Sequence, residues 1–112
     1  MLESITAPGG PAPLGPYSHA VRAGDLVFVS GQAALNPKTN QLEAGAAAAQ
    51  TRRALENIRT ILQVTGADLS DVVKCCVYLA DIQEFPEMNR VYAECFGESK
   101  PARTTAEVSE DL

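Results

Sequence analysis

The longest regular pattern in the chain lies in residues 44–64 and has the period of a helix. Apolar side chains recur there at spacings of three and four, while most charged side chains fall on the opposite side. Gly66 follows the last apolar residue, where a C-terminal cap is expected. The apolar stripe consists of Ala47, Ala48, Thr51, Leu55, Ile58, Ile61 and Leu62. The pattern predicts one long amphipathic helix with a single buried face.

A second amphipathic helix is predicted from Glu84 to Phe96. Its apolar face consists of Phe85, Met88, Tyr92 and Cys95. Gly97 marks the predicted C-terminal end of the helix. Both predicted helices are long enough to lie across a β-sheet, so we expect them to cover one.

Residues 7–16 are dense in proline and glycine, a composition that excludes an interior helix or strand. We expect an irregular arm that delivers Tyr17 to a fixed position. Residues 17–21 and 26–30 are rich in β-forming residues and are joined by a tight Gly24-Asp25 turn. This arrangement predicts a β-hairpin.

Two more strands are predicted in the second half of the chain. Residues 72–79 form a strongly β-forming run, and a last strand begins near Arg103 and continues through Val108. The resulting order, β-β-α-β-α-β, predicts an α+β sandwich in which a mixed sheet carries both helices on one face.

The strand at residues 72–79 is apolar on both of its faces, and residues 26–29 are apolar at every position. A strand that buries both faces needs a layer packed on each. Because two helices cover one side of the sheet only, we expect another copy of the protein to cover the other. The two faces consist of Val73, Cys75, Val77 and Leu79, and of Val72, Cys76 and Tyr78.

Length and charge restrict the class of protein. The 112 residues are enough for one domain, spanning residues 1–112, and the 46% of hydrophobic residues is ordinary for a folded protein. The formal net charge of −5 and the absence of a basic run disfavour nucleic acid as a partner, because phosphate backbones require clustered cations.

The compartment is predicted from the chain start and the cysteines. Met1–Ile5 lacks the basic start and apolar run of a signal peptide, and no stretch approaches the ~18 apolar residues that span a bilayer. The three cysteines are odd in number and lack metal or redox spacing, so we expect small apolar side chains kept reduced. A cytoplasmic protein without a membrane partner is the expectation.

Arg103 is the first candidate functional residue. It follows Pro101-Ala102 at the start of the last predicted strand, where its backbone is held rigidly. A guanidinium is always charged and presents a fork of donors that matches a carboxylate. One interpretation is a bidentate clamp on a substrate carboxylate. The other is an ion pair with a protein carboxylate, which is common for arginines.

Three further positions have two interpretations each. Ser30-Gly31, at the end of a predicted strand, either admits a ligand close to the backbone or simply forms a turn. Tyr17, at the end of the arm, either covers a site or packs half-buried. Asn89 either reaches across an interface or faces water.

Several kinds of catalytic site are excluded because the sequence lacks the residues or motifs that they need. His19 is the single histidine and is expected to be structural or solvent-facing, so it gives no Ser-His-Asp or Cys-His constellation and no transition-metal site. No glycine-rich phosphate loop is present. These observations favour positioning, carboxylate binding and attack by water.

Taken together, these stretches resemble the Rid family of reactive intermediate imine and enamine deaminases. The resemblance runs from about Ile5 to Val108, nearly the whole chain. The stretches that carry it are Gly15-Pro16-Tyr17-Ser18, Ser30-Gly31-Gln32, Asn36-Pro37-Lys38-Thr39, Asp71-Val72-Val73-Lys74, Asn89 to Tyr92 and Pro101-Ala102-Arg103.

The resemblance implies a chorismate-mutase-like α+β sandwich assembled as a homotrimer, with sites between subunits. It implies hydrolysis of 2-imino acids such as 2-iminopropanoate and 2-iminobutanoate, formed from enamines such as 2-aminoacrylate, without a cofactor. This detoxifies reactive metabolites. The implied site residues begin with Arg103, which would bind the carboxylate. Ser30 and Gly31 would line the pocket, Tyr17 would close it, and Asn89 would contribute from the interface.

Two departures from the family pattern bear on activity. Thr105, two residues after Arg103, occupies a position where family members often have cysteine. The sequence contains neither the further family strand nor its glutamate, which is thought to position water. An alternative is therefore a trimeric module that binds small carboxylates with weakened or lost turnover. Ribonuclease activity is a third possibility, which the acidic charge disfavours.

Overall fold

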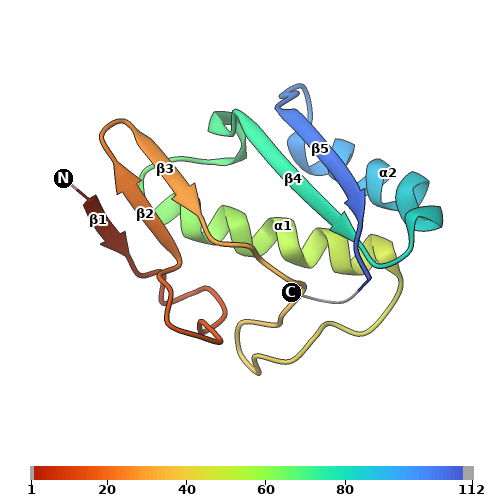
Figure 1. The fold of residues 1–112 in the computed structure, drawn as a ribbon, viewed down its shortest axis with the longest axis horizontal. Coiled ribbons are helices and arrows are strands. Elements are labelled where there is room, and N and C mark those ends of the chain that lie inside the picture. The colour runs from red at the N-terminus through yellow and green to blue at the C-terminus, as the bar shows by residue number, and fades with distance from the viewer. Residues whose placement is uncertain (1, 110–112) are drawn as a thin grey trace.

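The computed structural model describes residues 2–109 and has the predicted α+β class. The strands lie in front of the two helices in the view of Figure 1. The elements are β1 (Leu2–Ile5), β2 (Ala20–Ala23), β3 (Leu26–Val29), α1 (Ala47–Val64), a 3₁₀ turn (Leu69–Asp71), β4 (Lys74–Leu79), a second 3₁₀ turn (Ile82–Glu84), α2 (Phe85–Phe96) and β5 (Ala102–Glu107).

The strands form an antiparallel group and a parallel pair. β1, β2 and β3 pair antiparallel in that order, and Ala20 lies opposite both Ile5 and Val29. β4 and β5 pair in parallel, with Cys75 opposite Arg103. A parallel pair needs a long crossover connection, and α2 provides it. This crossover places α2 against the face of the pair on which Arg103 lies.

The predicted order was wrong at the start of the chain, because it omitted β1. The four residues of β1 are mostly exposed and only Ile5 is buried, so the strand depends on pairing with β2 beyond the proline-rich arm. Three predicted starts were also early. The hairpin begins at Ala20 rather than residue 17, the long helix at Ala47 rather than 44, and β4 at Lys74 rather than 72.

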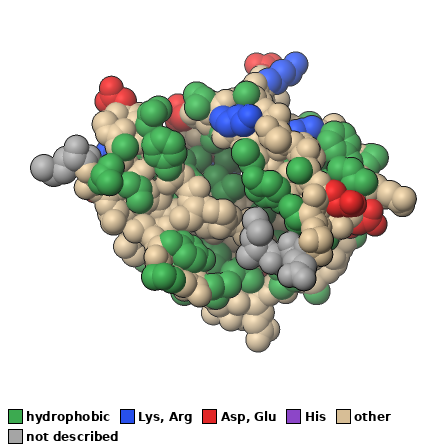
Figure 2. Space-filling model, in the orientation of Figure 1, with side chains coloured by type: hydrophobic (Ala, Val, Ile, Leu, Met, Phe, Trp, Pro, Cys, Tyr) green, Lys and Arg blue, Asp and Glu red, His purple; other side chains and the backbone are tan. Residues whose placement is uncertain are grey.

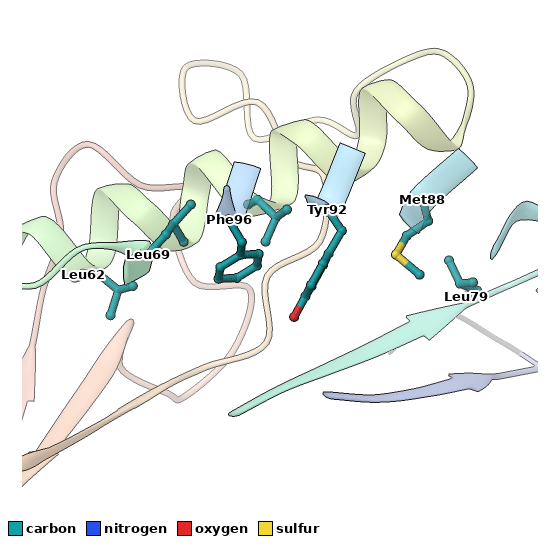
Figure 3. Close-up of a cluster of buried hydrophobic side chains, with 7 residues drawn as sticks. Leu62, Leu69, Leu79, Met88, Tyr92 and Phe96 are labelled. Carbon is teal, nitrogen blue, oxygen red and sulfur yellow. The ribbon is translucent and has the colours of Figure 1, made fainter. Parts of the chain in front are cut away.

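Two hydrophobic clusters meet along α1. The larger joins α1, α2 and β4 around Leu55, Leu79, Met88 and Tyr92, and part of it is drawn in Figure 3. The smaller joins β1, the arm and β2 around Ile61 of α1. Val29 of β3 packs against both clusters. Helix α1 therefore links the antiparallel strands to the part of the molecule that carries Arg103.

The proline-rich arm is fixed by His19, which is buried as part of the fold. Its Nδ1 accepts a hydrogen bond from the Ala7 amide at 2.9 Å, and its Nε2 lies 2.7 Å from the Pro11 carbonyl. These bonds require the neutral tautomer in which Nε2 donates. Of the two predicted positions, structural or solvent-facing, the structure shows the structural one, and the ring holds the arm that leads to Tyr17.

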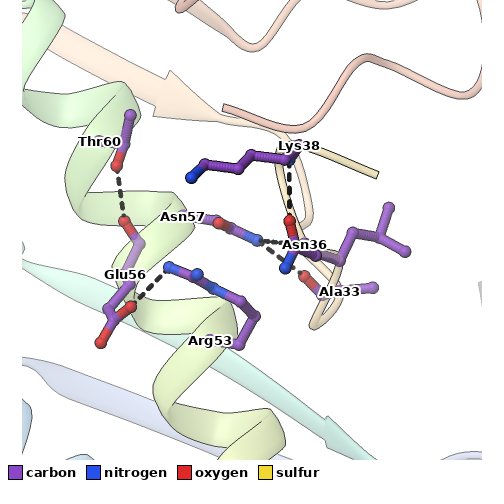
Figure 4. A network of polar contacts seen from close by, with 8 residues as sticks. Ala33, Asn36, Lys38, Arg53, Glu56, Asn57 and Thr60 are labelled. Carbon is purple, nitrogen blue, oxygen red and sulfur yellow. Dashed lines mark hydrogen bonds and ion pairs between the residues drawn. The ribbon is translucent and has the colours of Figure 1, made fainter. Parts of the chain in front are cut away.

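The loop after Gly31 is held by Asn57, a buried polar residue that the periodicity did not single out. Its amide nitrogen donates to the carbonyls of Ala33 and Leu35, the latter at 2.8 Å (Figure 4). Asn36 closes the turn beyond by accepting from the Lys38 amide. A buried amide that makes such bonds fixes the path of an otherwise irregular segment.

The strands leave an apolar outer face uncovered. Phe28 of β3 and Tyr78 of β4 are 60% and 54% exposed, and Leu26 and Cys76 are exposed beside them. Figure 2 shows hydrophobic side chains spread over this face, which is hollowed near its centre. Val73 was predicted to share a buried strand face with Cys75, and this was wrong, because Val73 precedes β4 and is 75% exposed. None of the described helices is long and apolar enough to cross a membrane.

Candidate carboxylate-binding site

Arg103 lies on β5 and faces helix α2. Its register partner on β4 is Cys75, which packs against the larger hydrophobic cluster, so the two side chains share the inner face of the parallel pair. β5 pairs only with β4 among the described residues. The guanidinium is therefore half-buried at a sheet edge, on a backbone whose hydrogen bonds fix its position.

Three residues of α2 surround the guanidinium. Phe85, Asn89 and Tyr92 follow one another at intervals of four and three residues, so they share one helical face. The Arg103 Nη1 donates to the Asn89 Oδ1 at 2.8 Å. Its Cζ lies 4.8 Å from the Tyr92 ring centroid and 5.3 Å from that of Phe85, both within cation–π range. We call these three residues the α2 cradle.

Arg103 has no carboxylate partner in the described part of the chain. Within residues 2–109, no Asp or Glu oxygen lies within ion-pair distance of it. Its Nε and Nη2 also have no hydrogen-bond partner in that part of the chain. The other arginines each pair with a carboxylate: Arg22, Arg52, Arg53, Arg59 and Arg90. The side-on Nε–Nη2 edge of Arg103 is thus available to an external carboxylate.

Burial keeps the groups beside Arg103 protonated. It raises the pKa of the Cys75 thiol above its usual value and raises the pKa of Tyr92 to about 12. The positive charge of Arg103 acts in the opposite direction on both groups but is a smaller influence. Neither group is thereby prepared to act as a nucleophile or base near neutral pH.

Thr105 lies two residues beyond Arg103 on the same side of β5. It is half-buried and is opposite Val77 in the register. Thr104 lies on the other side, where its hydroxyl accepts a hydrogen bond from Lys74 at 2.9 Å. The hydroxyl of Thr105 therefore faces the same layer as the guanidinium.

Tyr17, Ser30 and Gly31 form a second group, at the end of β3 and of the arm. The Ser30 hydroxyl donates to the Ser18 carbonyl at 2.6 Å, and the Leu14 amide donates to the Tyr17 hydroxyl at 3.1 Å. Gly31 is exposed, and a side chain there would meet no atom within 4 Å. No hydrogen bond within residues 2–109 joins this group to Arg103.

The structure thus brings together some of the predicted residues within one chain. Asn89, which was expected either to reach across an interface or to face water, contacts Arg103 of its own chain. Phe85 and Tyr92 were assigned to the core face of their helix and not to the site. Their spacing of seven residues around Asn89 was the available signal, but an apolar stripe does not reveal that its rings contact a cation.

Comparison with known proteins gives the family. The model of the family described as endoribonuclease L-PSP matches residues 8–110. A RutC family protein of Pyrococcus horikoshii is 50% identical over 97% of this chain and 86% of its own length. The 2-iminobutanoate/2-iminopropanoate deaminase of Dermatophagoides farinae is 38% identical, with 95% and 83% covered.

Solved structures agree with this comparison. The YjgF gene product of E. coli superimposes with a TM-score of 0.90 at 35% identity, covering 96% of this chain and 87% of that one. E. coli TdcF with bound serine gives 0.91 at 32% identity, covering 96% and 87%. By sequence and by fold, the chain belongs to the endoribonuclease L-PSP family, the YjgF/Rid family.

Proposed function

We propose that this protein hydrolyses reactive 2-imino acids, such as 2-iminopropanoate and 2-iminobutanoate, to 2-oxo acids and ammonia. The observation that carries the proposal is the Arg103 guanidinium, which is fixed by the α2 cradle and has no carboxylate partner in residues 2–109. Relatives named as a reactive intermediate deaminase, in Arabidopsis thaliana at 41% identity, and as a 2-iminobutanoate/2-iminopropanoate deaminase support the reaction class.

In the proposed reaction, Arg103 binds the carboxylate of the imino acid through two charge-assisted hydrogen bonds. Water then adds to the adjacent C=N carbon, its oxygen forming the new C–O bond while the nitrogen gains a proton. The tetrahedral adduct expels ammonia and leaves the 2-oxo acid. This sequence consumes one water and needs neither an oxidant nor a covalent nucleophile, so the work of the site is to orient the reactants.

Tyr17, Ser30, Gly31 and Thr105 complete the proposed site. Tyr17, Ser30 and Gly31 flank the antiparallel strands, whereas Arg103 lies in the parallel pair, and we propose that they meet an Arg103 at the interface between copies of the chain. The exposed Phe28 and Tyr78 support such an assembly, because large apolar side chains gathered on one face commonly mark an interaction surface. A homotrimer is the proposed assembly.

Cleavage of RNA is not part of the proposal, although the family description contains the word endoribonuclease. The chain has a net charge of −5, and five of its arginines are already paired with carboxylates. A phosphate backbone is bound mainly through clustered cations. The charge pattern suits one small anion better than a polyanion.

The test is a coupled reaction in which a serine dehydratase generates 2-aminoacrylate and the release of pyruvate is followed. We expect the protein to accelerate release, and Arg103→Ala to lower kcat/KM by roughly 100-fold, since a bidentate charge-assisted contact is lost. Arg90→Ala is the matched control, because Arg90 lies on α2 in an exposed ion pair with Glu94 and should matter little.

Two outcomes would contradict the proposal. Absence of any acceleration at stoichiometric protein would exclude the enzyme. Binding of pyruvate or 2-oxobutanoate without turnover would indicate a carboxylate-binding module in its place.

A further inference from the structure

We propose that Phe85 and Tyr92 are positioning residues for Arg103, and that Tyr92 acts through its aromatic ring while its hydroxyl takes no part in the reaction. The inference rests on the proposed function insofar as Arg103 binds a carboxylate. It goes further by assigning roles to two residues of α2 that pack like ordinary core and by excluding the hydroxyl of Tyr92 from the reaction.

The rings restrict the guanidinium in a direction that Asn89 leaves free. Asn89 accepts a hydrogen bond from Nη1, and this bond limits the movement of the guanidinium within the guanidinium plane. The rings of Phe85 and Tyr92, at 5.3 and 4.8 Å from Cζ, limit how the plane tilts. A cation over the face of an aromatic ring is also attracted to it. The combined result is a guanidinium whose Nε–Nη2 edge is presented in a single orientation.

The hydroxyl of Tyr92 is enclosed. Tyr92 is 8% exposed, and its hydroxyl has no partner at hydrogen-bond geometry in residues 2–109, although the Cys75 thiol is close enough to contribute to its raised pKa. Figure 3 shows it pointing from α2 toward β4, where Cys75 is the neighbouring polar group. A general acid must come within hydrogen-bond reach of the atom it protonates. An enclosed hydroxyl with a pKa of about 12 meets neither the geometric nor the acid–base requirement.

Ring and hydroxyl can be separated by substitution. Tyr92→Phe keeps the ring and removes an unsatisfied buried hydroxyl, whereas Tyr92→Leu and Phe85→Leu remove the ring contact. We expect Tyr92→Phe to bind 2-oxobutanoate more tightly than Tyr92→Leu, because the ring is kept, and each leucine variant to weaken binding and raise KM about tenfold relative to the wild type, with a smaller change in kcat. Val91→Ala is the control, because it perturbs the same buried helix and Val91 makes no cation–π contact with Arg103.

The experiment combines calorimetric titration with 2-oxobutanoate, the deaminase assay, and NMR of the arginine Nε–H groups. The Arg103 signal is assigned by its loss in Arg103→Lys. We expect ring-current displacement of this signal in the wild type and in Tyr92→Phe, and its reduction in both leucine variants. In an Arg103→Ala background, the leucine substitutions should cause no further loss of binding or rate, because the rings act through Arg103.

The proposal is overturned if Tyr92→Phe is as impaired as Tyr92→Leu, since the hydroxyl would then contribute. It is equally overturned if Tyr92→Leu leaves both the Arg103 signal and the 2-oxobutanoate affinity unchanged. If the wild type neither binds 2-oxobutanoate nor releases pyruvate, the proposed function fails. The NMR result then decides by itself whether the rings position Arg103.

Discussion

Arg103 differs from the other arginines of the chain in its surroundings rather than in its chemistry. Four of the other five lie in exposed ion pairs, which contribute little to stability. Arg103 is instead held by a neutral amide and two rings and has no carboxylate partner in residues 2–109. A folded protein gains little from a half-buried cation without a counter-charge, and the arrangement is explained if the counter-charge is a ligand.

Two glycines provide a test of the second group of site residues. Gly31 has open space around its Cβ position and no positive φ, so Gly31→Ala should change stability by less than about 0.5 kcal/mol. We nevertheless expect it to lower activity roughly tenfold or more, because a substrate or second copy approaches the backbone there. The measurements are urea unfolding and the deaminase assay.

Gly24 is the matched control for this prediction. It has a φ of 60°, so Gly24→Ala should cost about 1 kcal/mol of stability. Gly24 lies in the turn between β2 and β3, outside the proposed site, so the Gly24→Ala variant should keep its deaminase activity. If Gly31→Ala were fully active, the role given to the end of β3 would be wrong.

At the level of elements, periodicity predicted both helices to within three residues at their starts, because their apolar stripes and glycine stops are strong local signals. It failed for β1, which has one buried residue and depends on a distant strand. The sequence also led to Arg103 and Asn89 as candidates. The sequence did not predict that Arg103 and Asn89 contact each other, nor that Phe85 and Tyr92 belong to the site. The crossover between the parallel strands decides which face of the helix meets which strand, and the local sequence pattern does not reveal this.

The 3₁₀ turn between α1 and β4 is expected to make the fold sensitive to acid. Asp68 accepts from the Leu69 amide at 2.6 Å and pairs with Arg59 of α1. These contacts lower the pKa of Asp68 in the folded state, the Leu69 bond more than Arg59. The stabilisation is therefore present above the ordinary Asp pKa of about 3.9 and is lost as the pH falls through the lower folded value.

Asp68→Asn tests this dependence. We expect the variant to be less stable than the wild type at pH 7, and the difference to shrink as the pH is lowered below about 4. Urea unfolding at a series of pH values measures it. A difference that stays constant from neutral to acid pH would show that the Asp68 charge is not responsible.

At the level of the whole molecule, the outer face of the strands is the feature that a single chain leaves unexplained. Strands with two apolar faces are predicted to need a second layer of protein packed on them. The exposure of Phe28 and Tyr78 agrees with this prediction, while the assembly itself remains a proposal. The proposed function requires that the residues after β3 and Arg103 of β5 complete one site at the interface between copies.

Tyr78→Lys tests the assembly, because it places a charge in the centre of the proposed interface. We expect the wild type to sediment as a trimer, and the variant to sediment as a smaller species with little deaminase activity and an unchanged circular dichroism spectrum. Val64→Lys is the control, since Val64 is similarly exposed at 52% but lies at the end of α1. A trimeric Tyr78→Lys variant would mean that the interface lies elsewhere.

The most direct measurement is a crystal structure of the assembled protein with 2-oxobutanoate bound. The account predicts the carboxylate on the Nε–Nη2 edge of Arg103, at about 2.7–2.9 Å, with C2 facing Ser30 and Gly31 of an adjacent copy. A carboxylate bound away from Arg103, or an Arg103 paired in the assembly with a protein carboxylate, would contradict it.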